Sequence, residues 1–102
     1  MRLIMRLDVG TNMKRDYYSS SIANFLQAST EEIVGTLTIN SGFAVEATQR
    51  DAWLAQIAIL KTTLTDFDGK IYFEYSIPRM GKRIDVVLLI DCALFVLEFK
   101  IG

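Results

Sequence analysis

Asp85, Glu98 and Lys100 stand out among the charged residues of the largely apolar stretch "KRIDVVLLIDCALFVLEFKIG" that closes the sequence. Successive side chains of a strand alternate between its two faces, so Glu98 and Lys100 are expected to point the same way. On the preceding strand, Arg83, Asp85 and Val87 are expected to share a face. If the two strands are neighbours, Asp85 approaches Glu98, with Lys100 beside them. Two carboxylates in proximity repel each other unless a cation lies between them, and oxygen-only ligation suits Mg²⁺. The spacing therefore favours a metal site in which Lys100 orients or deprotonates a metal-bound water.

A plainer interpretation of the same residues also stands. Charges at strand ends often face solvent, and a surface pair between Glu98 and Lys100 is worth well under ~1 kcal/mol. The tripeptide "EFK" is not specific by itself. The motif "RID", followed by an apolar strand, a turn and a second apolar strand ending in "EFK", is more specific.

Composition limits the classes of function. The 102 residues are enough for one domain, and their net charge of −1 gives no bulk attraction to nucleic acid. With no histidine and one cysteine, zinc sites and Ser-His triads are excluded. Cys92 lies between two apolar runs and is expected to be a buried thiol. The apolar segments are too short or too charged for a signal peptide or a membrane span, so a soluble, cytoplasmic protein is expected.

Helical periodicity marks the first part of the chain. Apolar residues Ile22, Phe25 and Leu26 follow a serine cluster that can cap a helix. Ser29 and Glu32 form a capping-box pattern that opens a second helix, which the "NSG" at residues 40–42 ends. A third helix has Thr48 as its expected N-cap, and its apolar stripe is Trp53, Ile57, Leu60 and Leu64.

From residue 70 the period changes to two. Strands are expected at residues 70–77, 83–90 and 94–101. In the first of them, one face is expected to carry Ile71, Phe73, Tyr75 and Ile77, and the other Tyr72, Glu74 and Ser76. The fold class predicted is α+β, with N-terminal helices packed on a three-strand antiparallel meander.

The motifs "RDYYSSSIANFL", "QRDAWLAQIAILK" and "FEYSIPRMGKRIDVVLL", together with the terminal "EFK", carry a family resemblance over residues 14–102. The chain resembles the N-terminal segment of bacterial Schlafen group 3-like proteins, in which a PD-(D/E)XK nuclease-like domain precedes an ATP-dependent helicase-like domain. The resemblance implies a partial PD-(D/E)XK core and a metal-dependent nuclease acting on DNA or RNA. It makes Asp85 and Glu98 ligands of Mg²⁺ or Mn²⁺ and Lys100 the catalytic lysine.

The resemblance also bears on residues around that site. Glu74 matches an acidic position of the family and is expected to line the site. Gln49 stands where the fold often has a helix-borne acid and is a second candidate for lining the site, although a glutamine there departs from the pattern of a third metal ligand on the helix. Glu46, out of register, is expected to be solvated, and Trp53 is expected to pack in the core rather than stack on a base.

Basic residues around the expected hairpin, Arg79, Lys82 and Arg83, are candidates for contact with nucleic-acid phosphates. An ordinary solvated turn accounts for them equally well. The rival functions are a non-catalytic nucleic-acid-binding or interaction module and an inactive gene fragment.

The resemblance implies a helix and a strand after the lysine strand, so a truncated domain at residues 14–102 is expected. Residues 1–13 precede the resemblance and are expected to be an extension with a misassigned start. The partners implied are nucleic acid and a helicase or ATPase domain. Without cover, the third strand is expected to be an exposed apolar edge that forms a homodimer.

Overall fold

The computed structural model describes residues 15–42 and 44–100. The elements run in the order β1 (Tyr18–Ser21), α2 (Ile22–Gln27), α3 (Thr30–Ser41), α4 (Ala47–Thr63), β2 (Lys70–Ile77), a 3₁₀ turn (Pro78–Met80), β3 (Lys82–Ile90) and β4 (Ala93–Leu97). The expected extension at residues 1–13 lies outside the described residues. No helix in the described part of the chain is long and apolar enough to cross a membrane.

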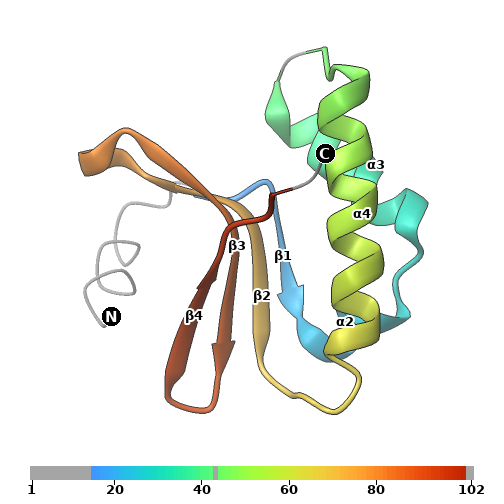
Figure 1. Ribbon diagram of the computed structural model, residues 1–102, viewed down its shortest axis with the longest axis vertical. Coiled ribbons are helices and arrows are strands. Elements are labelled where there is room, and N and C mark those ends of the chain that lie inside the picture. Colours follow the sequence, from blue (N-terminus) through green and yellow to red (C-terminus); the bar gives the residue numbers. More distant parts are fainter. Residues whose placement is uncertain (1–14, 43, 101–102) are drawn as a thin grey trace.

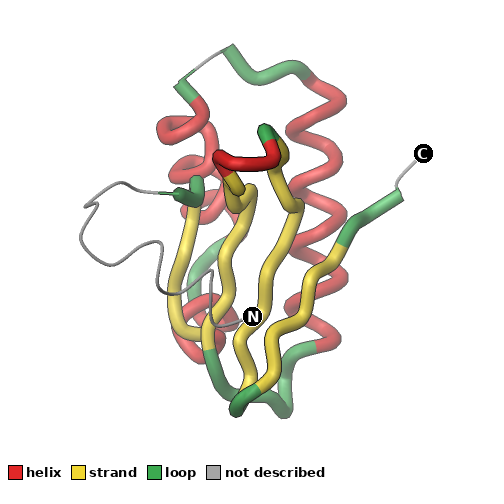
Figure 2. Tube along the Cα trace, turned by 90° about the vertical axis from the view of Figure 1, so that its left-hand side faces the viewer, coloured by secondary structure: helices red, strands yellow, loops and turns green. Residues whose placement is uncertain are grey.

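The strands form one antiparallel sheet in the order β1-β2-β3-β4, and the helices lie against one of its faces (Figures 1 and 2). The predicted α+β class is confirmed, but the sheet has four strands and not three. The additional strand, β1, comes from the serine-rich segment that the sequence assigned only to helix capping. Small polar residues carry little strand signal, and β1 is ordered by its pairing with β2 over residues 70–73.

Helix starts follow local capping chemistry at two of the three helices. The Ser21 hydroxyl accepts a hydrogen bond from the Asn24 amide at 3.0 Å, and the Ser29 hydroxyl accepts one from the Glu32 amide at 3.1 Å. Both bonds satisfy an N–H group that a helix start leaves unpaired. The expected cap at Thr48 is wrong, because the cap position lies two residues earlier, at Glu46, whose side chain makes no capping hydrogen bond.

One hydrophobic core joins the helices to the sheet. The predicted stripe of α4, Trp53, Ile57, Leu60 and Leu64, is buried, with exposed fractions of 3% or less. These side chains pack with the buried residues of the other elements: Ile22, Phe25, Ile33, Val34, Leu37, Ile71, Phe73, Val86 and Leu88. Trp53 is therefore a core residue, as expected.

Lys61, on the last turn of α4, ties that helix to the end of α2. Its ammonium group donates to the carbonyls of Phe25 at 2.7 Å, Leu26 at 3.1 Å and Ala28 at 2.5 Å. It also lies 5.1 Å from the centre of the Phe25 ring. A cation suits this place because the last carbonyls of a helix are unpaired and carry partial negative charge.

The sheet changes the face that it buries part-way along β2 and β3. Ile71 and Phe73 belong to the helix-side core, whereas Tyr75 joins a second cluster with Ile84 and Val87. The rings of Tyr72 and Tyr75 meet edge to face at 5.8 Å, although an unbroken strand would place them on opposite faces. The expected single apolar face from Ile71 to Ile77 is therefore wrong.

The change of face occurs at Glu74, which has a φ of 56°. The β2–β3 pairing runs from Lys70↔Leu89 to Phe73↔Val86 and resumes at Tyr75↔Ile84, so Glu74 and Asp85 stand opposite each other at an interruption in the ladder. A positive φ is unfavourable for a residue other than glycine, and such strain is typical of functional sites.

The edge strand β4 is shorter and more exposed than predicted. It ends at Leu97, so Glu98 and Lys100 follow the strand instead of lying on one of its faces. Phe95 and Val96 are 46% and 49% exposed. Cys92, expected to be buried, is exposed in the turn before β4.

Candidate active site

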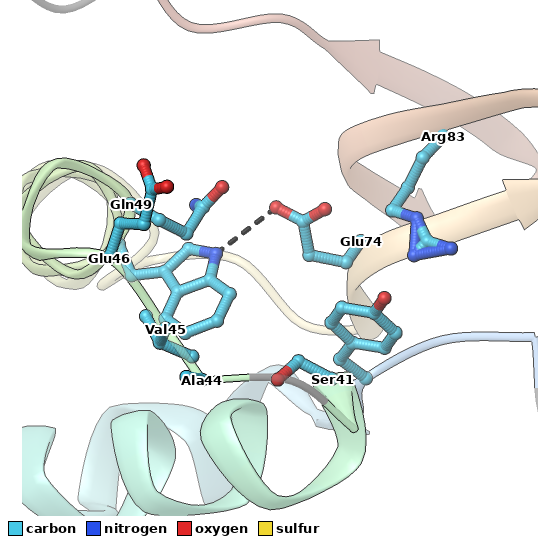
Figure 3. Close-up of a pocket in the computed structure, with 9 residues that line it drawn as sticks. Ser41, Ala44, Val45, Glu46, Gln49, Glu74 and Arg83 are labelled. Carbon is cyan, nitrogen blue, oxygen red and sulfur yellow. Dashed lines mark hydrogen bonds between the residues drawn. The ribbon is translucent and has the colours of Figure 1, made fainter.

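Glu74 is the buried carboxyl of the described structure. Its exposed fraction is 9%, and its Oε2 accepts a hydrogen bond from Trp53 Nε1 at 3.1 Å (Figure 3). The indole therefore gives one carboxyl oxygen a partner inside the fold, which a buried polar group requires. The bond also joins α4 to the interruption in β2, because Trp53 comes from the helix and Glu74 from the strand.

Burial raises the pKa of Glu74 above its ordinary value of 4.5. The hydrogen bond from Trp53 and the charge of Arg83 oppose this shift, whereas the negative charges of Asp85 and Glu98 add to it. Asp85 on β3 and Glu98 after β4 thus both act on the Glu74 carboxyl through their charges. The predicted convergence of Asp85 and Glu98 on each other stays a prediction.

A second contact fixes the segment after β4. The Phe99 amide donates a hydrogen bond to Asp85 Oδ2 at 2.9 Å. Asp85 is partly buried, whereas Glu98 and Lys100, on either side of Phe99, are exposed. The bond therefore brings the "EFK" tripeptide beside Asp85 even though the tripeptide is not part of a regular strand.

The carboxylates do not form a complete metal cage. Within residues 15–42 and 44–100, no three Asp, Glu or Cys side chains are grouped so that they could hold a metal ion. The metal site expected at Asp85 and Glu98 stays a prediction, because Mg²⁺ is often held by only one or two carboxylates and several waters.

A pocket of about 410 Å³ opens beside Glu74. It is lined by Tyr17, Ser41, Ala44, Val45, Glu46, Gln49, Trp53, Glu74 and Arg83 (Figure 3). Gln49 and Glu74, named from the sequence as site-lining residues, thus face the same cavity. Asp85, Glu98 and Lys100 are not among its described lining residues.

Arg83 differs in its surroundings from the other basic residues of the hairpin. Its guanidinium lies over the Tyr17 ring, 4.5 Å from the ring centre, and forms one wall of the pocket. Arg79 and Lys82 are exposed at the turn, where Gly81 adopts a φ of 58°. Of the three candidates for nucleic-acid contact, Arg83 alone is among the described residues that line this cavity.

Sequence reasoning missed several pocket residues. Tyr17 and Ser41 are distant in sequence from Glu74 and lack a motif, and Glu46 was expected to be solvated. Glu46 is indeed exposed, but it lies at the pocket wall. The signal available in the sequence was Glu74 itself, a carboxyl within the otherwise apolar and aromatic run "IYFEY".

Comparison with known proteins finds no matching family model, no matching curated protein and no matching solved structure. The function is therefore argued from the geometry of the site.

Proposed function

We propose that the protein is a metal-dependent, nuclease-like domain that hydrolyses phosphodiester bonds of DNA or RNA. The observation that carries the proposal is the hydrogen bond from the Phe99 amide to Asp85, because Phe99 is the central residue of the "EFK" tripeptide that contains Glu98 and Lys100. A helix followed by antiparallel strands β2, β3 and β4, with the acids on β3 and just after β4, supports the partial PD-(D/E)XK core that the sequence resemblance implies.

In this proposal Asp85 and Glu98 would hold Mg²⁺ or Mn²⁺. The ion, when bound, would supply a Lewis acid for the phosphate and lower the pKa of a bound water. Lys100 supplies a mobile cation beside the two carboxylates, suited to orienting the attacking water and balancing negative charge on the phosphate. The pair of ligands predicts weak metal binding with little selectivity between Mg²⁺ and Mn²⁺. By the same resemblance, the domain would act beside a helicase or ATPase domain.

The test is cleavage of single- and double-stranded DNA and RNA with and without Mg²⁺ or Mn²⁺. Glu98→Gln and Lys100→Ala each remove a functional group from an exposed side chain, so the fold should be retained. We expect each to reduce cleavage by about 100-fold or more, the scale of one group acting in proton transfer. Glu31→Gln and Lys70→Ala make the same chemical changes at exposed positions elsewhere and should leave cleavage unchanged. Cleavage that persists in a chelator, or in Glu98→Gln, would refute the proposal.

A second candidate is a nucleic-acid-binding module without turnover. The exposed Arg79 and Lys82 at the hairpin favour it, because basic side chains dominate phosphate contacts. Salt-sensitive binding without metal-dependent cleavage, weakened by Arg79→Ala and Lys82→Ala, would select this candidate over the nuclease.

A further inference from the structure

The pocket beside Glu74 has a size and polarity that the hydrolytic step does not require. Its volume of about 410 Å³ falls in the range of cavities that hold small molecules. The hydrolytic groups Asp85, Glu98 and Lys100 lie outside its described lining. The cavity therefore has room for a part of the substrate other than the reacting phosphate.

Hydrogen-bonding groups of opposite character face this space. The Glu74 carboxyl is fixed by Trp53 through Oε2, and a carboxylate has about four acceptor sites, so acceptor capacity remains for a ligand. Arg83 provides N–H donors in a planar fork. Figure 3 shows the carboxyl of Glu74 and the guanidinium of Arg83 on neighbouring sides of the pocket, with Gln49 and Glu46 on its helix side.

Flat surfaces complete the lining. The guanidinium of Arg83 is stacked on Tyr17, with 4.5 Å between the guanidinium carbon and the ring centre. Tyr17 thereby orients the guanidinium plane, so that its N–H groups donate to a ligand lying in that same plane. Ala44 and Val45 add apolar surface to the same cavity. A planar, aromatic ligand with polar edges matches these walls better than a sugar or an aliphatic chain.

Among the nucleobases, guanine matches the two polar walls. One of its edges presents the acceptors O6 and N7, which arginine binds in bidentate fashion. Its other edge presents two adjacent N–H donors, N1 and the exocyclic N2, which a carboxylate can accept together. Adenine and cytosine offer one amino donor at the corresponding edge, and uracil offers one ring N–H.

We propose that this pocket receives one guanine base of a single-stranded nucleic acid, next to the phosphodiester that is cleaved, with Glu74 accepting from its N–H edge and Arg83 donating to its acceptor edge. The inference rests on the proposed nuclease function for the identity of the substrate. Its binding step, however, is measurable without cleavage.

The native chain itself supplies the probe. Trp53 is the one tryptophan of the sequence, so a ¹⁵N–¹H spectrum contains one indole signal, from the N–H that donates to Glu74. Titration with guanosine, adenosine, cytidine and uridine 5′-monophosphates, without divalent metal, should move this signal saturably. We expect guanosine monophosphate to bind about tenfold more tightly than the other three, the lower end of the discrimination that one bidentate contact gives.

Three variants identify the contacts. Glu74→Gln should abolish the preference for guanosine monophosphate, and Arg83→Gln, a change at an exposed side chain, should weaken its binding about tenfold. Arg50→Gln makes the same change on an exposed part of α4 outside this pocket and should change nothing. If Glu74→Gln does not fold, Arg83→Gln alone still decides. Equal shifts with all four nucleotides, no shift at millimolar concentration, or unchanged guanine binding in Arg83→Gln would overturn the inference.

The two proposals fail separately. Guanine-selective binding by a chain that cleaves no substrate would refute the nuclease proposal and support the guanine pocket. Metal-dependent cleavage that Glu98→Gln abolishes, without guanine-selective binding, would support the nuclease proposal and refute the guanine pocket.

Discussion

The two halves of β2 pack in opposite directions, and the difference separates the part of the sheet that stabilises the fold from the part that forms the site. Ile71 and Phe73 are completely buried against the helices. Beyond Glu74, Tyr75 and Ile77 belong to the smaller cluster on the other face. A regular ladder would have continued the first arrangement to the hairpin, covered the helix side with apolar groups and left no carboxyl there.

The interruption at Glu74 and Asp85 has a chemical consequence. It turns the Glu74 side chain into the space between α4 and the sheet, where Trp53 holds it. It also leaves Asp85 available to the Phe99 amide. The positive φ of Glu74 and the burial of its carboxyl both oppose folding, so the larger helix-side core must offset them.

The largest effect is expected from a comparison of the two halves of β2, with one substitution on each side of Glu74. Ile71→Ala should lower the free energy of unfolding by about 2–5 kcal/mol, because it leaves a cavity in a fully buried site. Ile77→Ala, the same change in a partly exposed side chain, should cost about 1 kcal/mol or less. Urea denaturation followed by circular dichroism measures both. Equal losses would mean that the two halves contribute alike and that the comparison is wrong.

The parts of the fold that depend on local sequence patterns were predictable. The stripe from Trp53 to Leu64 and the cap at Ser29 follow from spacing and from one hydroxyl, and the structure confirms both. The face change in β2 was not predictable, because strict alternation through residues 71–77 predicts one continuous strand face. It depends on a φ of 56° at Glu74 and on an indole from α4, which a period of two cannot reveal.

The acids of the candidate site were named from the sequence, whereas the walls of the pocket were not. The expectation that Glu98 and Lys100 share a strand face is wrong, because β4 ends at Leu97, and the contact with Asp85 is made by the backbone amide of Phe99. The roles of Asp85, Glu98 and Lys100 stay a prediction. Tyr17 and Ser41 enter the pocket because β1 pairs with β2 and α3 ends nearby. Such long-range placement leaves no local pattern in the sequence.

An intermediate effect is expected for Glu74→Gln, which keeps an acceptor for Trp53 and removes the charge. Because the pKa of Glu74 is raised in the folded state, chiefly by burial, its carboxyl favours folding below pH 4.5 and that contribution is lost as pH rises through the folded-state value. The variant should therefore be more stable than the native chain at pH 7, by less than about 2 kcal/mol, the scale of one buried polar group.

The pH dependence is the decisive feature of this prediction. Urea midpoints measured from pH 4 to pH 8 should show the stability difference between Glu74→Gln and the native chain growing as pH rises from the ordinary value of 4.5. Glu31→Gln, at an exposed position on α3, should change the free energy of unfolding by about 0.5 kcal/mol or less. A difference for Glu74→Gln that shrinks as pH rises would show that the carboxylate form is the one that the fold stabilises.

The prediction with the smallest effect on folding stability concerns self-association of the chain through the edge strand β4. β4 is one of the two edge strands of the described sheet, and its sequence "ALFVL" carries neither charge nor proline to discourage pairing. Its Phe95 and Val96 side chains are about half exposed on opposite faces. We predict that the chain forms a symmetric dimer by antiparallel pairing of two β4 strands. A two-fold axis at Phe95 pairs all five residues, Ala93 with Leu97 of the other copy and each Phe95 with its own equivalent.

Sedimentation velocity at tens of micromolar protein, with Cys92 kept reduced, measures this assembly. Phe95→Lys places two like charges across the axis and should give a monomer, while the free energy of unfolding at high dilution changes by about 1 kcal/mol or less because the side chain is already half exposed. Ile59→Lys, at a 49% exposed position on α4, removes a comparable exposed apolar side chain from outside the strand and should leave the dimer intact. A native chain that sediments as a monomer would refute the pairing. A dimer that survives Phe95→Lys but not Ile59→Lys would place the interface on the helices instead of on β4.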